Sequence, residues 1–124
     1  FVRYLMQCFL KGEAATLQTP KYVRDNIHVD LLALRYLAFC NEMTADQAAR
    51  KCNPSGYVES QEAFALRVAR EVSKRLSKEC RVAKSDQADF SEPLIRINTE
   101  PADQVVEWSE EKAWDALVDF YTSA

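Results

Sequence analysis

The segment from Ser60 to about Ser77 constrains the fold more than any other part of the sequence. Its apolar residues recur every four positions, and two alanines stand beside them: Phe64, Val68, Val72 and Leu76, with Ala65 and Ala69. This spacing predicts an amphipathic helix whose apolar stripe must be covered by other elements. Four basic residues fall on its other faces, where we expect solvated charges: Arg67, Arg70, Lys74 and Arg75.

Three further segments have helical patterns. The first stripe, which Gly12 can end, is Val2, Leu5, Met6, Phe9 and Leu10. Asp30 can cap the run LLALRYLAFC, which is apolar nearly all round, so we expect that helix to be buried on more than one side. Ser109 can begin a last helix, whose stripe is Ala113, Trp114, Leu117, Val118 and Tyr121.

Short strands are predicted between these helices. After Pro20, apolar residues alternate with polar ones from 23 to 29, which is typical of a strand. The segment KCNPSG predicts a brief strand running into a turn, and residues 80–83 predict another. Residues 94–97 form a clearer strand that we expect to stop at Pro101. The alternation predicts a mixed α/β fold, a single domain over 1–124 with a small sheet and about four helices.

Composition excludes several classes of function. The formal net charge is −3, with both signs mixed along the chain, so we expect neither a nucleic-acid interface nor a membrane-binding patch. The four cysteines contain no C-x-x-C pair and there is one histidine, which makes a metal site improbable on residue types alone. Reduced thiols and the absence of an export pattern favour a cytoplasmic protein.

The strand predicted over 23–29 has an informative alternation. Arg24, Asn26 and His28 share one face, while Asp25 lies on the other face among apolar side chains. A carboxylate in that position needs donors, and we expect backbone amides or a neighbouring side chain to supply them. The planar fork of Arg24 suits a phosphate or a carboxylate, and spacing alone leaves a structural ion pair equally open.

The segment YVRDNIHVDLLA resembles the Arg-Asp-(aromatic)-Ile-(His/Tyr)-Val-Asp-Asp segment of the NAD-dependent epimerases and dehydratases that act on nucleotide sugars, which are extended short-chain dehydrogenases. FVRYLMQCFLKGE is similar to the helix and glycine before that segment, and CNPSGYVESQEAFALRVAREV to the turn and helix after it. LIRINTEPADQVVEWSEEKAWDAL resembles the closing part, with Trp108 at the family's tryptophan.

The resemblance implies the C-terminal lobe that closes over the sugar nucleotide. In the family a Rossmann lobe binds NAD, and its Tyr-x-x-x-Lys pair does the acid–base chemistry. Neither that pair nor a glycine-rich dinucleotide loop is in this sequence, so we expect no catalytic residue and no cofactor here. The resemblance therefore implies a substrate-binding fragment, inactive alone, of an enzyme whose missing Rossmann domain holds NAD.

Four residues are the candidates for binding a nucleotide-diphosphate sugar. Arg24 stands at the position where the family has an arginine on the nucleotide or diphosphate, and Asn26 shares its face. Arg96 and Lys84 are the nearest basic residues to a second family arginine, which has no direct counterpart in KSDQADFSEPL. Asn26 and Leu31 also depart from the family pattern.

One alternative function stays open, a stand-alone α/β module that binds a protein partner and no nucleotide.

Loss of a neighbouring lobe exposes an interdomain surface of roughly 600–1,500 Å². The apolar run LLALRYLAFC can form part of such a surface. For that reason we expect a fragment of this kind to self-associate as a homo-oligomer.

Overall fold

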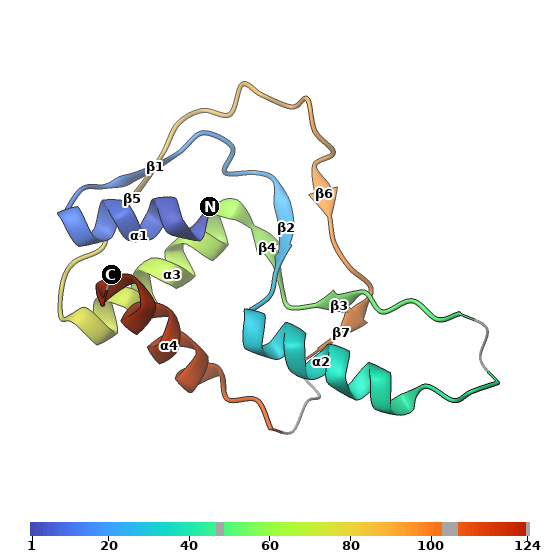
Figure 1. The fold of residues 1–124 in the computed structure, drawn as a ribbon. Helices are drawn as coiled ribbons and strands as arrows, with labels where there is room; N and C mark the ends of the chain where they lie inside the picture. Colours follow the sequence, from blue (N-terminus) through green and yellow to red (C-terminus); the bar gives the residue numbers. More distant parts are fainter. Residues whose placement is uncertain (47–48, 103–106, 124) are drawn as a thin grey trace.

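The computed structural model describes residues 1–46, 49–102 and 107–123. Over these residues the chain forms four helices and seven short strands, which confirms the mixed α/β class (Figure 1). The elements in chain order are α1 (Val2–Lys11), β1 (Ala15–Leu17), β2 (Val23–Asn26), α2 (Val29–Glu42), β3 (Pro54–Ser55), β4 (Tyr57–Ser60), α3 (Gln61–Leu76), β5 (Val82–Lys84), β6 (Ile95–Arg96), β7 (Glu100–Pro101) and α4 (Glu110–Thr122).

The hydrophobic core lies where α3 meets α1 and α4 (Figure 1). The predicted stripe of α3 is confirmed, since Phe64, Val68 and Val72 are all buried. Leu5, Met6 and Phe9 of α1 and Trp114 and Val118 of α4 belong to the same cluster. Leu10, which we placed on the stripe of α1, is partly exposed because Cys8 takes the buried position instead.

The ends of α1 and α3 agree with the sequence. Gly12 ends α1 in the left-handed region at φ 79°, a conformation that glycine adopts at no steric cost. The Ser60 hydroxyl accepts a hydrogen bond from Ala63 N–H and so caps α3. Ser109 caps α4 in the same way through Lys112 N–H. Ser77 ends α3 at φ 49°, an uncommon conformation for a residue with a Cβ.

The strands form three small sheets rather than one. β1 and β5 pair in parallel beside α1 and α3. β2 lies at the centre of the second sheet, antiparallel to β4 and parallel to β6. β3 and β7 pair in parallel next to α2, away from the helical core (Figure 1). β2 therefore joins the helical core to the outer elements.

The strand that we predicted over 23–29 is shorter than expected. It ends at Asn26, and Val29 already belongs to α2. His28, rather than Asp30, caps this helix, because its Nδ1 accepts the backbone N–H of Asp30 at 3.1 Å. Thus the histidine that we placed on a strand face belongs to the junction between β2 and α2.

The expectation for α2 itself is wrong. Leu31 is its one buried residue, and Val29 and Leu37 are 68% and 58% exposed. The helix packs through one side only, beside β3 and β7, while its other side faces solvent (Figure 1). An apolar composition could not reveal this, because it does not say how many neighbours a helix has.

Three of the short strands also differ from the prediction. No strand was predicted where β1 lies, and the strand expected within KCNPSG lies at Pro54–Ser55, with β4 directly after Gly56. Pro101 belongs to β7 instead of ending β6. Strands of two or three residues carry too little alternation to be recognised, since their positions depend on distant partners.

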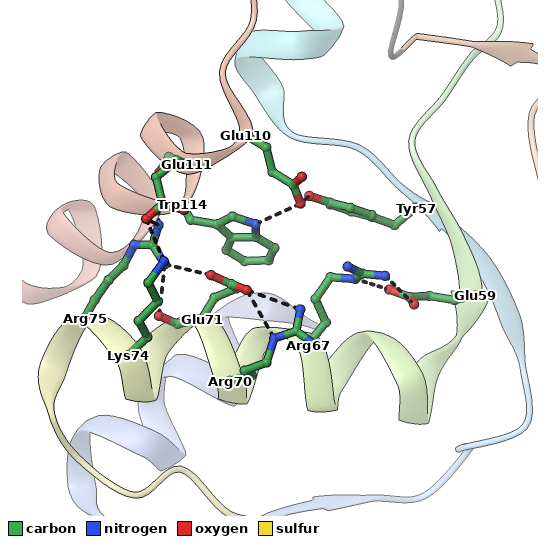
Figure 2. A network of polar contacts seen from close by, with 10 residues as sticks. All are labelled: Tyr57, Glu59, Arg67, Arg70, Glu71, Lys74, Arg75, Glu110, Glu111 and Trp114. Carbon is green, nitrogen blue, oxygen red and sulfur yellow. Dashed lines mark hydrogen bonds and ion pairs between the residues drawn. The ribbon is translucent and has the colours of Figure 1, made fainter.

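The basic residues of α3 are not all solvated. Arg75 is only 10% exposed, and it bonds Glu71 of its own helix as well as Glu111 and Asp115 of α4. Figure 2 shows Lys74 and Arg75 directed at Glu111 across the two helices. Arg70 remains exposed, as predicted. Ion pairs therefore connect α3 with α4 at the margin of the core.

No helix in the part of the chain that the structure describes is long and apolar enough to cross a membrane.

Candidate functional site

Two arginines lie next to each other on neighbouring strands. Arg24 of β2 and Arg96 of β6 are partners in the strand register. Both guanidinium groups face the carboxylate of Glu92, at 3.0 Å from Arg24 Nη2 and 3.5 Å from Arg96 Nη1. Together with Asp25, Ile97 and Asn98 they line an open hollow of about 400 Å³, which we call the arginine hollow.

The two arginines differ in how firmly they are held. Arg24 is 18% exposed, and its Nη1 donates to the carbonyl oxygens of Val23, Pro93 and Leu94. Its guanidinium also stacks on Tyr22 at 4.5 Å from the ring centre. Arg96 is 60% exposed and pairs with Glu92 alone among the described residues. Arg24 thus fixes β6 against β2, while Arg96 is available to an outside anion.

Asp25 closes the floor of the arginine hollow. Its two carboxylate oxygens accept the backbone N–H groups of Gly56 at 2.7 Å and of Asn98 at 2.9 Å. The expectation that backbone amides satisfy this carboxylate is confirmed. Gly56 has to be glycine, because a Cβ there would collide with the carbonyl oxygen of Asn26 and the Cα of Ile27. Asp25 and Gly56 together hold the ends of β4 and β6 against β2.

Beside the arginine hollow is a second cavity, of about 330 Å³, which we call the aromatic cavity. It lies between β2, β4, α3 and α4, and Asp25 lines both hollows. Asn26 and His28 contribute to its wall, so the structure separates Asn26 from the two arginines. The remaining wall is mostly apolar and includes both tryptophans of the chain.

A short hydrogen-bond network borders the aromatic cavity. The Tyr57 hydroxyl donates to Glu110 Oε1, and the Trp114 indole N–H lies 3.4 Å from the same oxygen (Figure 2). Burial and, second, the bond to the Glu110 carboxylate raise the pKa of Tyr57 far above its usual range. The guanidinium group of Arg67 lies over the ring of Tyr57. The same group donates two hydrogen bonds to the carboxylate of Glu59. Tyr57 therefore stays a neutral hydrogen-bond donor.

The structure places Lys84 away from both hollows. It is on β5, opposite Leu17 of β1, and its ammonium pairs with Glu62 at 2.7 Å. Of the four candidate residues, then, the structure brings Arg24 and Arg96 together, sets Asn26 in the adjoining cavity, and leaves Lys84 in a surface pair.

The glycines of the chain do not form a dinucleotide-binding turn. The two glycines end α1 and lie between β3 and β4, so neither opens a phosphate-binding turn between a strand and a helix. Over the ranges 1–46, 49–102 and 107–123, no three acidic, histidine or cysteine side chains gather as metal ligands.

Three residues of this region escaped the sequence reasoning. Glu92 is 68 positions from the arginine that it binds, and Tyr57 is 53 positions from Glu110. Nothing in the local sequence links such partners. They come together through the register of β2 with β4 and β6, which brings residues 57–60 and 95–96 beside 23–26 in the structure.

Comparison with known proteins adds no assignment, since no family model, curated protein or solved structure matches this chain.

Proposed function

We propose that this chain is the substrate-binding part of an NAD-dependent enzyme that epimerises or dehydrates nucleotide sugars, and that it binds the diphosphate of the sugar nucleotide. The observation that carries the proposal is the arginine hollow, where two guanidinium groups share a single surface carboxylate. The resemblance of YVRDNIHVDLLA to the substrate segment of that family supports the same assignment.

The two carboxylates at the hollow are held in different ways. Asp25 already accepts two backbone N–H groups, whereas Glu92, whose side chain is 53% exposed, is the carboxylate that faces the two guanidinium groups. A diphosphate offers several oxygens in the geometry that guanidinium groups bind best. It would displace the Glu92 carboxylate into solvent, where that group is easily hydrated. The backbone bonds of Arg24 would be kept, so the hollow is already formed before an anion binds.

The proposal assigns the chemistry to another part of the enzyme. Hydride transfer requires NAD, and we propose that a Rossmann lobe outside this sequence holds it, as in the family resembled. The role of this chain would then be to orient the sugar and to exclude water from the reacting atoms. Such a chain should bind substrate without converting it.

Calorimetric titration with a panel of nucleoside-diphosphate sugars tests the proposal. Arg24→Ala should weaken binding by roughly 1.5–3 kcal/mol, the range for hydrogen bonds to charged groups. Arg24→Lys is the matched control for charge, since it keeps the cation and loses the fork. Circular dichroism checks that both variants fold. Equal affinity of wild type and Arg24→Ala for every sugar of the panel would remove Arg24 from the site.

A second candidate function rests on the outer side of α2. Its exposed apolar side chains fall at the spacing of one helical stripe: Val29, Ala33, Tyr36, Leu37 and Cys40. Such a face favours a protein-interaction module. Binding of a nucleotide sugar in the titration above argues for the first function, because an interaction module has no use for it.

A further inference from the structure

A third hollow, which we call the glutamine hollow, lies between the start of α1, the strand β1 and the first turn of α3. Its volume is about 340 Å³, and Phe1, Tyr4, Thr19 and Gln61 are among the residues that line it. This volume falls within the range for ligand pockets, roughly 300–1,000 Å³. None of the described residues that line it belongs to the arginine hollow or to the aromatic cavity. The glutamine hollow is therefore a separate candidate site.

Two aromatic rings stand on one side of the glutamine hollow. The Tyr4 hydroxyl accepts the N–H of Thr16 at 2.9 Å and donates to the carbonyl oxygen of the same residue at 3.1 Å. Because the hydroxyl is engaged with β1, the exposed part of Tyr4, a residue with 42% exposure, is mainly its ring. Phe1, three residues earlier and hence on the same side of the helix, is 47% exposed. The two rings offer a ligand an apolar surface.

Gln61 and Thr19 supply the polar side. The Thr19 hydroxyl donates to Gln61 Oε1 at 2.9 Å, so the amide nitrogen is the end of Gln61 that is left for another partner. Among the described residues, the indole nitrogen of Trp108 is the one buried side-chain nitrogen or oxygen that lacks a partner. The Gln61 nitrogen forms no hydrogen bond in that part of the chain, so it must be accessible to solvent. A ligand in the hollow can therefore reach this donor, and the Thr19 oxygen can accept a hydrogen bond as well.

The walls of the glutamine hollow favour an uncharged ligand. The described residues that line it include no acidic and no basic side chain. A phosphate or an ammonium group would lose hydration there without gaining a charged side-chain partner. A pyranose sugar suits the same walls, because its C–H faces pack on aromatic rings and its hydroxyl groups both donate and accept hydrogen bonds.

We propose that the glutamine hollow binds a neutral pyranose sugar. One C–H face of the sugar packs on the rings of Tyr4 and Phe1, and one of its hydroxyl oxygens accepts a hydrogen bond from the Gln61 amide. The proposal is independent of the proposed function, since it involves neither a diphosphate nor a residue of the arginine hollow. A sugar without any phosphate should therefore bind.

Titration of the ¹⁵N-labelled chain with phosphate-free glycosides tests the proposal. The probes are the methyl β-pyranosides of glucose, galactose, mannose and N-acetylglucosamine, each added to tens of millimolar. In ¹H–¹⁵N spectra at least one of them should shift the side-chain amide resonances of Gln61 in a saturable way. The indole resonances of Trp108 and Trp114, which line the aromatic cavity, should stay in place. No saturable change at Gln61 with any glycoside overturns the proposal, and changes at the indoles alone overturn it as well.

Three variants separate the hydrogen bond from the apolar surface. Gln61→Met removes the amide, keeps the chain length and suits a helix, and it should weaken the best glycoside about tenfold. Gln7→Met is the matched control, because Gln7 is an exposed glutamine of α1 outside the hollow, and it should bind as the wild type does. Tyr4→Leu removes one ring and should weaken binding several-fold. Equal affinities of Gln61→Met and Gln7→Met would contradict the proposal. If Tyr4→Leu fails to fold, the wild-type shifts and Gln61→Met still decide.

Discussion

Replacement of Arg75 by methionine should destabilise the chain more than any other change at a basic residue of α3. The Arg75 side chain is 10% exposed and makes four hydrogen bonds. Two go to the carboxylate and the carbonyl oxygen of Glu71, one goes to the Asp115 carboxylate, and one goes to the Glu111 carbonyl oxygen. Arg75 also forms an ion pair with the Glu111 carboxylate. Methionine keeps the apolar stem, so the loss measures the charge and its hydrogen bonds rather than packing.

The magnitude follows from what each partner loses. Glu111 and Asp115 are 60% and 55% exposed, and water can replace the arginine for both at little cost. Glu71 is only 14% exposed and would keep just the more distant Arg70. Breaking a buried pair costs about 3–5 kcal/mol, and the exposed partners reduce this, so we expect about 2–3 kcal/mol.

Urea unfolding at neutral pH, followed by circular dichroism, measures this free energy. Arg70→Met is the matched control, because Arg70 also binds Glu71 but is 66% exposed, and it should cost under about 0.5 kcal/mol. An unchanged m-value would show that both variants unfold the same surface. Equal costs for the two variants would refute the reasoning that burial of Arg75 decides its contribution.

Three further predictions concern other parts of the fold. Gly56→Ala should cost about 1–3 kcal/mol in the same urea assay, because its Cβ would meet the backbone of Asn26 and Ile27; a cost below about 0.5 kcal/mol would contradict this. The pKa of Tyr57 is raised on folding, so its contribution to stability is complete below about pH 10 and is lost as the pH rises further. The stability curves of wild type and Tyr57→Phe should therefore converge in alkali, and parallel curves would be inconsistent with the raised pKa. Finally, sedimentation should show that the wild type self-associates in a concentration-dependent way through the exposed apolar side of α2. Leu37→Lys should abolish this self-association and Asn41→Lys should not. A monodisperse wild-type monomer would contradict the prediction.

The helices could be predicted from the sequence because their information is local. The stripe Phe64, Val68, Val72 repeats within one element, and Ser60 and Ser109 cap through N–H groups three residues away. The short strands could not be placed, since two residues of β6 acquire their register only from β2. The exposure of α2 could not be predicted for the same reason, because the burial of a helix depends on neighbouring elements that its own sequence pattern does not specify.

The candidate site was predicted in part. Sequence alternation and the family resemblance indicated Arg24. The alternation also predicted apolar neighbours for Asp25 and hence its need for backbone donors; the donors are present, although Asp25 lies beside Arg24 and Arg96 in the hollow. The partners that give these residues their roles are far away in sequence. Glu92, which bridges the two arginines, and Gly56, which approaches the backbone of Asn26, became visible only when β4 and β6 were seen beside β2.

The central claim is that the arginine hollow binds a diphosphate in place of Glu92. Parallel calorimetric titrations of one nucleoside-diphosphate sugar into wild type, Arg96→Gln and Glu92→Gln test it most directly, because both positions are largely exposed and the variants should fold. The account predicts shifts in opposite directions, with Arg96→Gln about tenfold weaker and Glu92→Gln several-fold tighter than wild type. Shifts in the same direction, or unchanged affinity in both variants, would contradict it.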